Sequence, residues 1–156
     1  MMIKWFSAAQ FLSPLINVRK DQWGGELQDR AKLLYEIISQ VKKTCGKQFI
    51  VSVKLNSADF QRGGFDVADA IEVVKTLNAM GMDFIELSGG SYEAPAMQGK
   101  SGDERTLARE AYFLTFAKQI AQHSSIPVMT TGGIKRLTVA NEVLAANIDL
   151  VGIASA

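Results

Sequence analysis

Short apolar segments alternate with amphipathic helical segments along most of the chain. Four segments have the length and the apolar, β-branched composition of buried strands: residues 49–55, 83–88, 126–131 and 149–153. Apolar residues at helical spacing lie before and between them, at about 26–45, 66–80, 106–122 and 137–146. Strands that alternate with helices of this length pair in parallel through right-handed crossovers. The pattern therefore predicts an α/β fold made of consecutive strand–helix units.

The length of the chain limits how far this pattern can extend. A complete eight-fold β/α barrel needs about 250 residues, whereas this chain has 156. No linker, low-complexity tract or internal repeat divides it, so we expect one domain over residues 1–156. Hydrophobic residues make up 47% of the sequence, which is enough to form a buried core.

Charge and residue content argue against several classes of partner and site. Lys and Arg number 17 and Asp and Glu 16, and the basic residues are dispersed, so no nucleic-acid interface is expected. No apolar run approaches 18 residues, so no membrane-spanning helix is expected. The single cysteine, Cys45, and the single histidine, His123, leave no disulfide framework and no apparent metal site. We expect a cytoplasmic protein that acts on a small-molecule substrate.

Candidate ligand-binding residues follow the predicted strands. In parallel α/β folds, ligands bind beyond the carboxyl ends of the strands. The residues at or just past those ends are Lys54, Ser88, Gly89, Gly90, Gly132, Gly133 and Ile134. His123 precedes the third strand and so belongs to the opposite rim, which favours a solvated loop residue over a catalytic base.

Two of these positions have both a functional and a purely structural interpretation. Glycines after a strand, as at Gly132 and Gly133, let backbone N–H groups approach a phosphate, but they also suit a tight turn into a helix. Lys54 ends an otherwise apolar strand. Its cation could face an electron-rich ring or a phosphate, or its stem could simply cross the strand end to reach solvent.

Residues 10–30 read QFLSPLINVRKDQWGGELQDR. This segment resembles the signature of the old yellow enzyme-like NADH:flavin oxidoreductases. Later segments match in the same order: VKL at 53–55, DF at 59–60 with GG at 63–64, ELSGG at 86–90, PVMTTGGI at 127–134 and DLVGI at 149–153. The resemblance spans nearly all of the chain after Ala9. It implies a β/α barrel that binds FMN at its carboxyl face and reduces activated alkenes or related acceptors with NAD(P)H.

The resemblance also assigns roles to individual residues. Lys54 matches the basic residue that contacts the pyrimidine side of the flavin, where a cation would stabilise negative charge on the reduced ring. Gly132, Gly133 and Ile134 match the loop whose amides hold the FMN phosphate. Three further residues at strand ends complete the expected cofactor-binding set: Ser88, Gly89 and Gly152.

The sequence departs from the family pattern at both ends. The family's substrate-binding His pair and proton-donor Tyr fall where this chain has Lys4 and Phe6, and Phe6 has no proton to donate. No catalytic residue is therefore assigned, and residues 1–9 are expected to be an unrelated tail. A phosphate-binding Arg is replaced by Ser155.

The expected architecture is a partial (β/α)8 barrel, about strands five to eight with their helices. A truncated FMN-dependent oxidoreductase is one interpretation. The alternative is a non-catalytic half-barrel fragment with weak or no FMN binding, and whether the chain is an enzyme by itself stays open. A half barrel would leave two sheet edges exposed, which predicts self-association.

Overall fold

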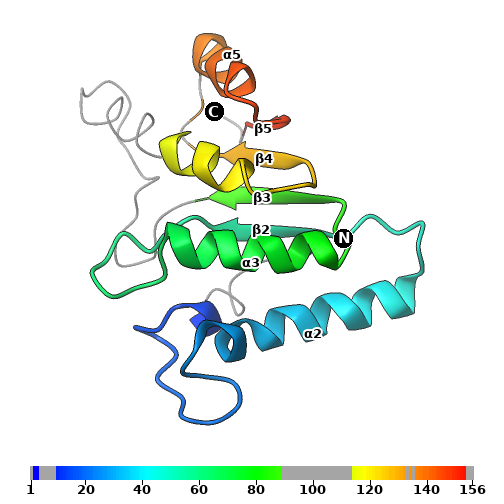
Figure 1. Ribbon diagram of the computed structural model, residues 1–156. Coiled ribbons are helices and arrows are strands. Elements are labelled where there is room, and N and C mark those ends of the chain that lie inside the picture. Colours follow the sequence, from blue (N-terminus) through cyan, green and yellow to red (C-terminus); the bar gives the residue numbers. More distant parts are fainter. Residues whose placement is uncertain (1, 4–9, 89–113, 133, 135, 154–156) are drawn as a thin grey trace.

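A computed structural model describes residues 2–3, 10–88, 114–132, 134 and 136–153. Its centre is a sheet of five parallel strands that are neighbours in the order of the sequence (Figure 1). These strands are β1 (Met2–Ile3), β2 (Ser52–Asn56), β3 (Phe84–Ser88), β4 (Val128–Thr131) and β5 (Leu150–Gly152). Parallel strands in sequential order are the arrangement of a β/α barrel wall. This confirms the predicted partial barrel.

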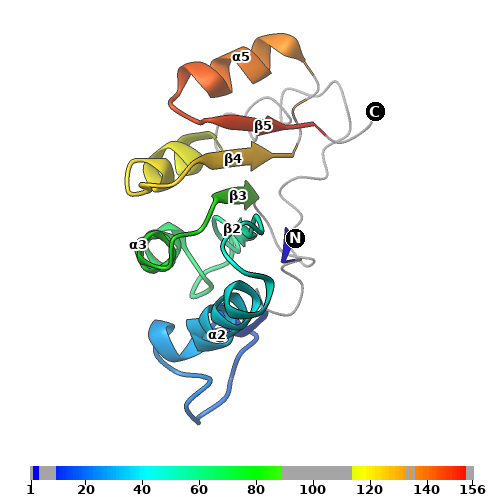
Figure 2. The same cartoon turned by 90° about the vertical axis from the view of Figure 1, so that its right-hand side faces the viewer.

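Helices connect the strands and cover one face of the sheet. They are α2 (Leu27–Cys45), α3 (Val67–Ala79) and α5 (Leu137–Ala145), and residues 114–121 are also helical. In Figure 2 these helices form an arc around the strands, as they do on the outside of a barrel. No helix among the described residues is both long and apolar enough to cross a membrane.

The core lies between the strands and this arc of helices. Strand side chains alternate between the two faces of a sheet, and those on the helix-facing side are apolar and almost fully buried: Val53, Leu55, Ile85, Leu87 and Val128. They belong to the same hydrophobic cluster as Ile38 of α2 and Leu77 of α3. Burying large aliphatic side chains contributes about 1.5–3 kcal/mol each. The opposite face of the same strands carries polar residues, and it is there that the candidate site forms.

Two of the predicted elements differ most from the observed ones. The first predicted strand begins at Phe49, but the structure starts β2 at Ser52, because Phe49 and Ile50 are 39% and 61% exposed. The helix predicted over 106–122 is observed only at 114–121, and its earlier part lies outside the described residues. The structure also contains β1, which the sequence pattern did not predict; Met2 pairs with Ser52 and Ile3 with Val53.

Candidate functional site

Three polar side chains from three neighbouring strands meet near the carboxyl edge of the sheet. Lys54 of β2 lies opposite Glu86 of β3 in the strand register, and their side chains form an ion pair. Thr131 at the end of β4 joins them: its hydroxyl donates to Glu86 Oε1 at 2.8 Å and accepts from Lys54 Nζ at 3.2 Å. Each member of this Lys54–Glu86–Thr131 network therefore contacts the other two.

Burial explains why the network is complete. The Glu86 side chain is only 5% exposed, whereas that of Lys54 is 24% exposed. A carboxylate removed from water is costly unless it is paired and hydrogen-bonded. Glu86 gains both a cation and a hydroxyl, and the Lys54 side chain stays partly exposed. The sequence analysis missed Glu86; the signal was an acidic residue inside an otherwise apolar strand.

Gly152 of β5 leaves space for this network. Glycine lacks the Cβ atom, and a Cβ added at Gly152 would lie 2.2 Å from Thr131 Cγ2, well inside van der Waals contact. Gly152 and Thr131 are partners in the β4–β5 register. The glycine therefore allows the Thr131 methyl group to sit against β5. This packing role is one that the sequence analysis did not assign to Gly152.

The last residue of β2 places a second polar group on the same face. Asn56 follows Lys54 by two residues, so both side chains lie on one side of β2. Asn56 Nδ2 donates to Asp59 Oδ1 at 3.1 Å. Because a carboxylate only accepts, this bond directs the amide oxygen away from Asp59. Asn56 Oδ1 is buried and has no partner among the described residues.

The other predicted residues have structural contacts or lie outside the described part. The Ser88 hydroxyl points to the backbone, with Leu55 O at 3.5 Å. Gly132 has a φ of +107°, a conformation that favours glycine. The Ile134 side chain is 7% exposed and belongs to the core, so only its backbone could contact a ligand. Gly89 and Gly133 lie outside the described residues.

The structure keeps His123 and Cys45 away from the carboxyl edge. His123 follows the helix at 114–121 and precedes β4, and its carbonyl accepts from Asn78 Nδ2 at 2.9 Å. Both residues are exposed. Within the described ranges, no three His, Cys, Asp or Glu side chains cluster in a way that could hold a metal ion.

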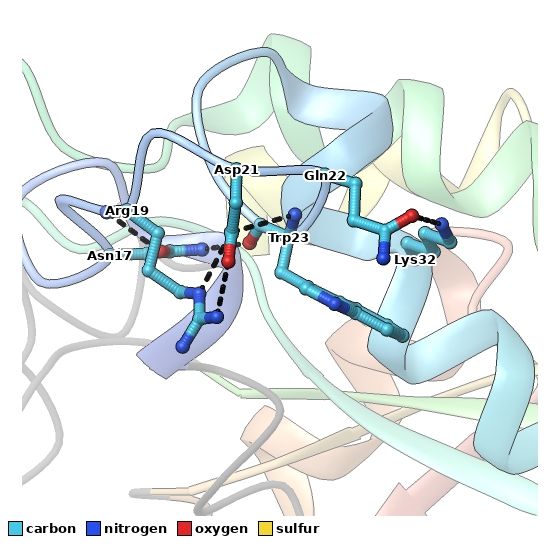
Figure 3. Close-up of polar contacts among 6 residues, drawn as sticks. All are labelled: Asn17, Arg19, Asp21, Gln22, Trp23 and Lys32. Carbon is cyan, nitrogen blue, oxygen red and sulfur yellow. Dashed lines mark hydrogen bonds and ion pairs between the residues drawn. The ribbon is translucent and has the colours of Figure 1, made fainter.

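The signature at residues 10–30 forms a loop held by its own polar side chains (Figure 3). Asn17 Nδ2 donates to the carbonyls of Phe11 and Trp23, at 2.8 and 2.7 Å. Arg19 forms an ion pair with Asp21, and the hydrogen bond from Arg19 lowers the pKa of the Asp21 carboxyl. Lys32 lies over the ring of Trp23, 4.8 Å from its centroid. These contacts give the motif a structural role.

Arg30 ties this loop to the helices. Its Nε donates to Leu12 O and its Nη1 to Gly25 O, both at 2.7 Å. Its Nη2 bonds Asp69 of α3 at 3.0 Å. Arg30 is only 7% exposed, and its burial is tolerated because each of its three nitrogens donates a hydrogen bond. The loop, α2 and α3 are therefore joined through one side chain.

The chain has relatives in one protein family. The model of the NADH:flavin oxidoreductase / NADH oxidase family matches residues 5–156. An NADH-dependent flavin oxidoreductase of Neonectria sp. is 36% identical, over 96% of this chain and 20% of the relative. An NADPH dehydrogenase of Bacillus velezensis is 31% identical, over 93% of this chain and 40% of the relative. The chain thus spans less than half the length of these relatives.

Solved structures with this fold include two reductases. A 2-naphthoyl-CoA reductase superimposes with a TM-score of 0.77 at 27% identity, over 92% of this chain and 22% of the other. A morphinone reductase in complex with tetrahydroNAD gives a TM-score of 0.66 at 20% identity, over 94% of this chain and 36% of the other. At that lower identity the second match bears on the fold alone.

Proposed function

Because this chain belongs to the NADH:flavin oxidoreductase / NADH oxidase family, we propose that it contributes strands β2–β5 to an FMN-dependent oxidoreductase of the old yellow enzyme type. The reaction passes reducing equivalents from NAD(P)H through flavin to an activated alkene or a related small-molecule acceptor. Flavin and NAD(P)H are the redox partners named by the family and its relatives. FMN, the acceptor class and the placement of the cofactor are the parts that are proposed.

The groups at the carboxyl edge suit a flavin. The edge offers a cation, Lys54, whose ammonium group has three donors, of which the described contacts occupy two. It also offers the buried acceptor Asn56 Oδ1, which lacks a partner among the described residues. The pyrimidine side of a flavin carries both acceptors and an N–H donor. A pair of complementary groups two residues apart therefore fits such a ring better than it fits an inorganic ion.

The chain's own residues would bind and orient the cofactor. When bound, flavin supplies hydride transfer. Lys54 would place its positive charge against the pyrimidine side of the ring and favour the negative charge gained on reduction. The loop between β4 and α5, at Gly132, Gly133 and Ile134, would supply backbone amides to the phosphate. No described residue is assigned a proton-transfer role.

The observation that carries the proposal is the Lys54 ammonium group held at the carboxyl edge of a parallel sheet. FMN binding tests it directly. We expect the purified chain to take up FMN, measured by quenching of flavin fluorescence, and a Gly133→Asp variant to lose binding by at least tenfold, because a carboxylate beside the phosphate would repel it.

Gly46→Asp is the matched control for that experiment. It introduces the same side chain at a glycine that follows α2, away from the carboxyl edge. FMN affinity equal in the two variants would contradict the assignment of the β4–α5 loop.

The alternative is a half barrel that has lost catalysis and binds FMN weakly or not at all. The chain spans 20–40% of the length of the relatives described above, so contacts made elsewhere in those proteins could be needed. A colourless preparation that takes up no added FMN would favour this alternative. We also propose a cytoplasmic location, since a single exposed cysteine suits a reducing compartment; cell fractionation tests it.

A further inference from the structure

We propose that Glu86 and Thr131 are positioning residues for Lys54. They fix its ammonium group near the carboxyl edge of the sheet, and the Glu86 carboxylate sets how much of the Lys54 charge a bound flavin experiences. The second half of this inference rests on the proposed function. The first half concerns the chain alone and can be tested without cofactor.

The geometry gives the ammonium group a defined position. Lysine has four rotatable side-chain bonds, and ordering a free lysine costs up to about 2 kcal/mol of rotamer entropy. Here two partners from different strands hold it, a carboxylate on β3 and a hydroxyl on β4. The hydroxyl also donates to the carboxylate, so neither partner can turn away without breaking a second bond. Such a closed set of hydrogen bonds is stronger than separate pairs.

A fourth strand restrains the hydroxyl. The Thr131 methyl group occupies the space that a Cβ atom at Gly152 would need. Any side chain at position 152 would force Thr131 to move, and its hydroxyl would leave Lys54 and Glu86. Four neighbouring strands therefore contribute to the position of Lys54 Nζ, whereas a surface ion pair needs only two side chains.

Charge is the second consequence of the arrangement. Glu86 is buried and carries a formal negative charge beside the positive charge of Lys54, so the pair is close to neutral as seen from a ligand. In a partly desolvated site each of these charges acts more strongly than in water. Glu86→Gln keeps the size and an accepting oxygen but removes the negative charge. The Lys54 charge would then be less screened, and the negative charge that flavin gains on reduction would be better stabilised.

The first experiment measures the reactivity of Lys54 in the folded, cofactor-free chain. Acetylation of each lysine by an amine-reactive reagent is followed by mass spectrometry, with the exposed Lys75 as the internal standard. We expect Lys54 to react at least threefold faster in Thr131→Val and Gly152→Ala than in the wild type. Thr131→Ser retains the hydroxyl and should stay within about twofold of the wild type. Equal Lys54 rates in all four proteins would overturn the positioning role.

The second experiment measures the midpoint potential of the flavin-loaded chain. We expect Glu86→Gln to raise it by at least about 30 mV, which is tenfold in a two-electron equilibrium, and Lys54→Met to lower it. In the double variant the effect of Glu86→Gln should shrink, because the charge that it exposes is absent. A potential that is unchanged or lower in Glu86→Gln would overturn the charge-setting role, whatever its effect on stability.

The two experiments separate this inference from the proposed function. If the wild type and all variants fail to bind FMN, the proposed function fails and the charge-setting role fails with it. The acetylation rates still decide whether Thr131 positions Lys54. If FMN binds and the rates do not change, only the positioning role is wrong.

Discussion

The sequence patterns contain two groups of residues with different roles: some hold the fold, and others form the candidate site. The signature at 10–30 is specific in sequence, yet its polar side chains mostly bind one another and the backbone of the loop. The residue proposed to face the flavin is Lys54, which has little sequence context. Its partner Glu86 could not be assigned from sequence, because the pairing depends on the register between two strands 32 residues apart. A motif can therefore identify a family through residues that hold the fold.

Arg30 is the residue of the signature whose loss should cost most. Replacing it with Lys keeps the charge but cannot satisfy two backbone carbonyls and Asp69 at once. We expect Arg30→Lys to lower the free energy of unfolding by about 2–4 kcal/mol, since each buried group left unsatisfied costs about 1–3 kcal/mol. Urea denaturation measures this. Arg62→Lys, at an exposed loop position, is the control and should change stability by less than about 0.5 kcal/mol. Similar losses in both variants would contradict the role of Arg30.

Asp69 predicts a pH dependence of stability. Burial raises the pKa of its carboxyl, and the charge of Arg30 opposes this only in part. A raised pKa means that the folded chain holds the proton more tightly than the unfolded chain, where the pKa is about 3.9. The contribution of Asp69 to stability is therefore fully present below about pH 3.9 and is lost as pH rises through its folded-state pKa.

Asp69→Asn tests this sign. The variant cannot titrate, so we expect its stability to lack the decrease that Asp69 contributes to the wild type as pH rises through that range. Urea denaturation at a series of pH values measures the difference, with Asp29→Asn at an exposed position of α2 as the control. The reasoning fails if the difference in stability between the wild type and Asp69→Asn does not change with pH, or if it changes in the opposite direction.

At the scale of elements, apolar periodicity was sufficient for most of the architecture. All four predicted strands are present, because buried parallel strands require a continuous apolar run that few other elements share. Helices α2, α3 and α5 lie within a residue or two of their predicted bounds. β1 could not be predicted, since two residues carry no period. The start of the first predicted strand was also misplaced. Phe49 and Ile50 are apolar, but they are not buried.

Helices α2 and α3 differ in how they begin. We therefore expect the stability of the chain to respond differently to substitution of the residue that precedes each helix. Asp66 caps α3, with its carboxylate accepting from Asp69 N at 3.0 Å. Glu26 precedes α2 but makes no side-chain cap bond. We expect Asp66→Ala to destabilise the chain by about 1 kcal/mol and Glu26→Ala to change stability much less. Thermal denaturation followed by circular dichroism compares them. A larger loss in Glu26→Ala would show that the cap assignment is wrong.

For the whole molecule, the sheet has two outer strands, β1 and β5, whose far sides pair with no described strand. Apolar residues lie exposed near the β5 edge, including Leu150 at 44% and Ile153 at 67%. Unpaired edges with apolar neighbours favour association between chains. We therefore expect the chain to self-associate through this edge.

Analytical ultracentrifugation of two matched variants tests that expectation. Leu150→Lys places a charge on the β5 edge and should shift the distribution towards the monomer. Leu15→Lys introduces the same charge at an equally exposed leucine, also 44%, in the loop at residues 13–26, and should leave the distribution unchanged. A monomeric wild type, or equal shifts in both variants, would count against association through β5.

The parallel topology also has a consequence for how the chain folds. Paired positions are separated by 21 residues in β4–β5, as between Met129 and Leu150, and by 50 in β1–β2, as between Met2 and Ser52. The entropy of closing such loops grows only with the logarithm of their length, so these closures differ by less than about 1 kcal/mol. Chain separation therefore gives no pair a clear kinetic advantage. The nucleus should form where most side chains are buried, at β2 and β3, with the outer strands adding later, and folding should be slower than in a helical bundle of this size.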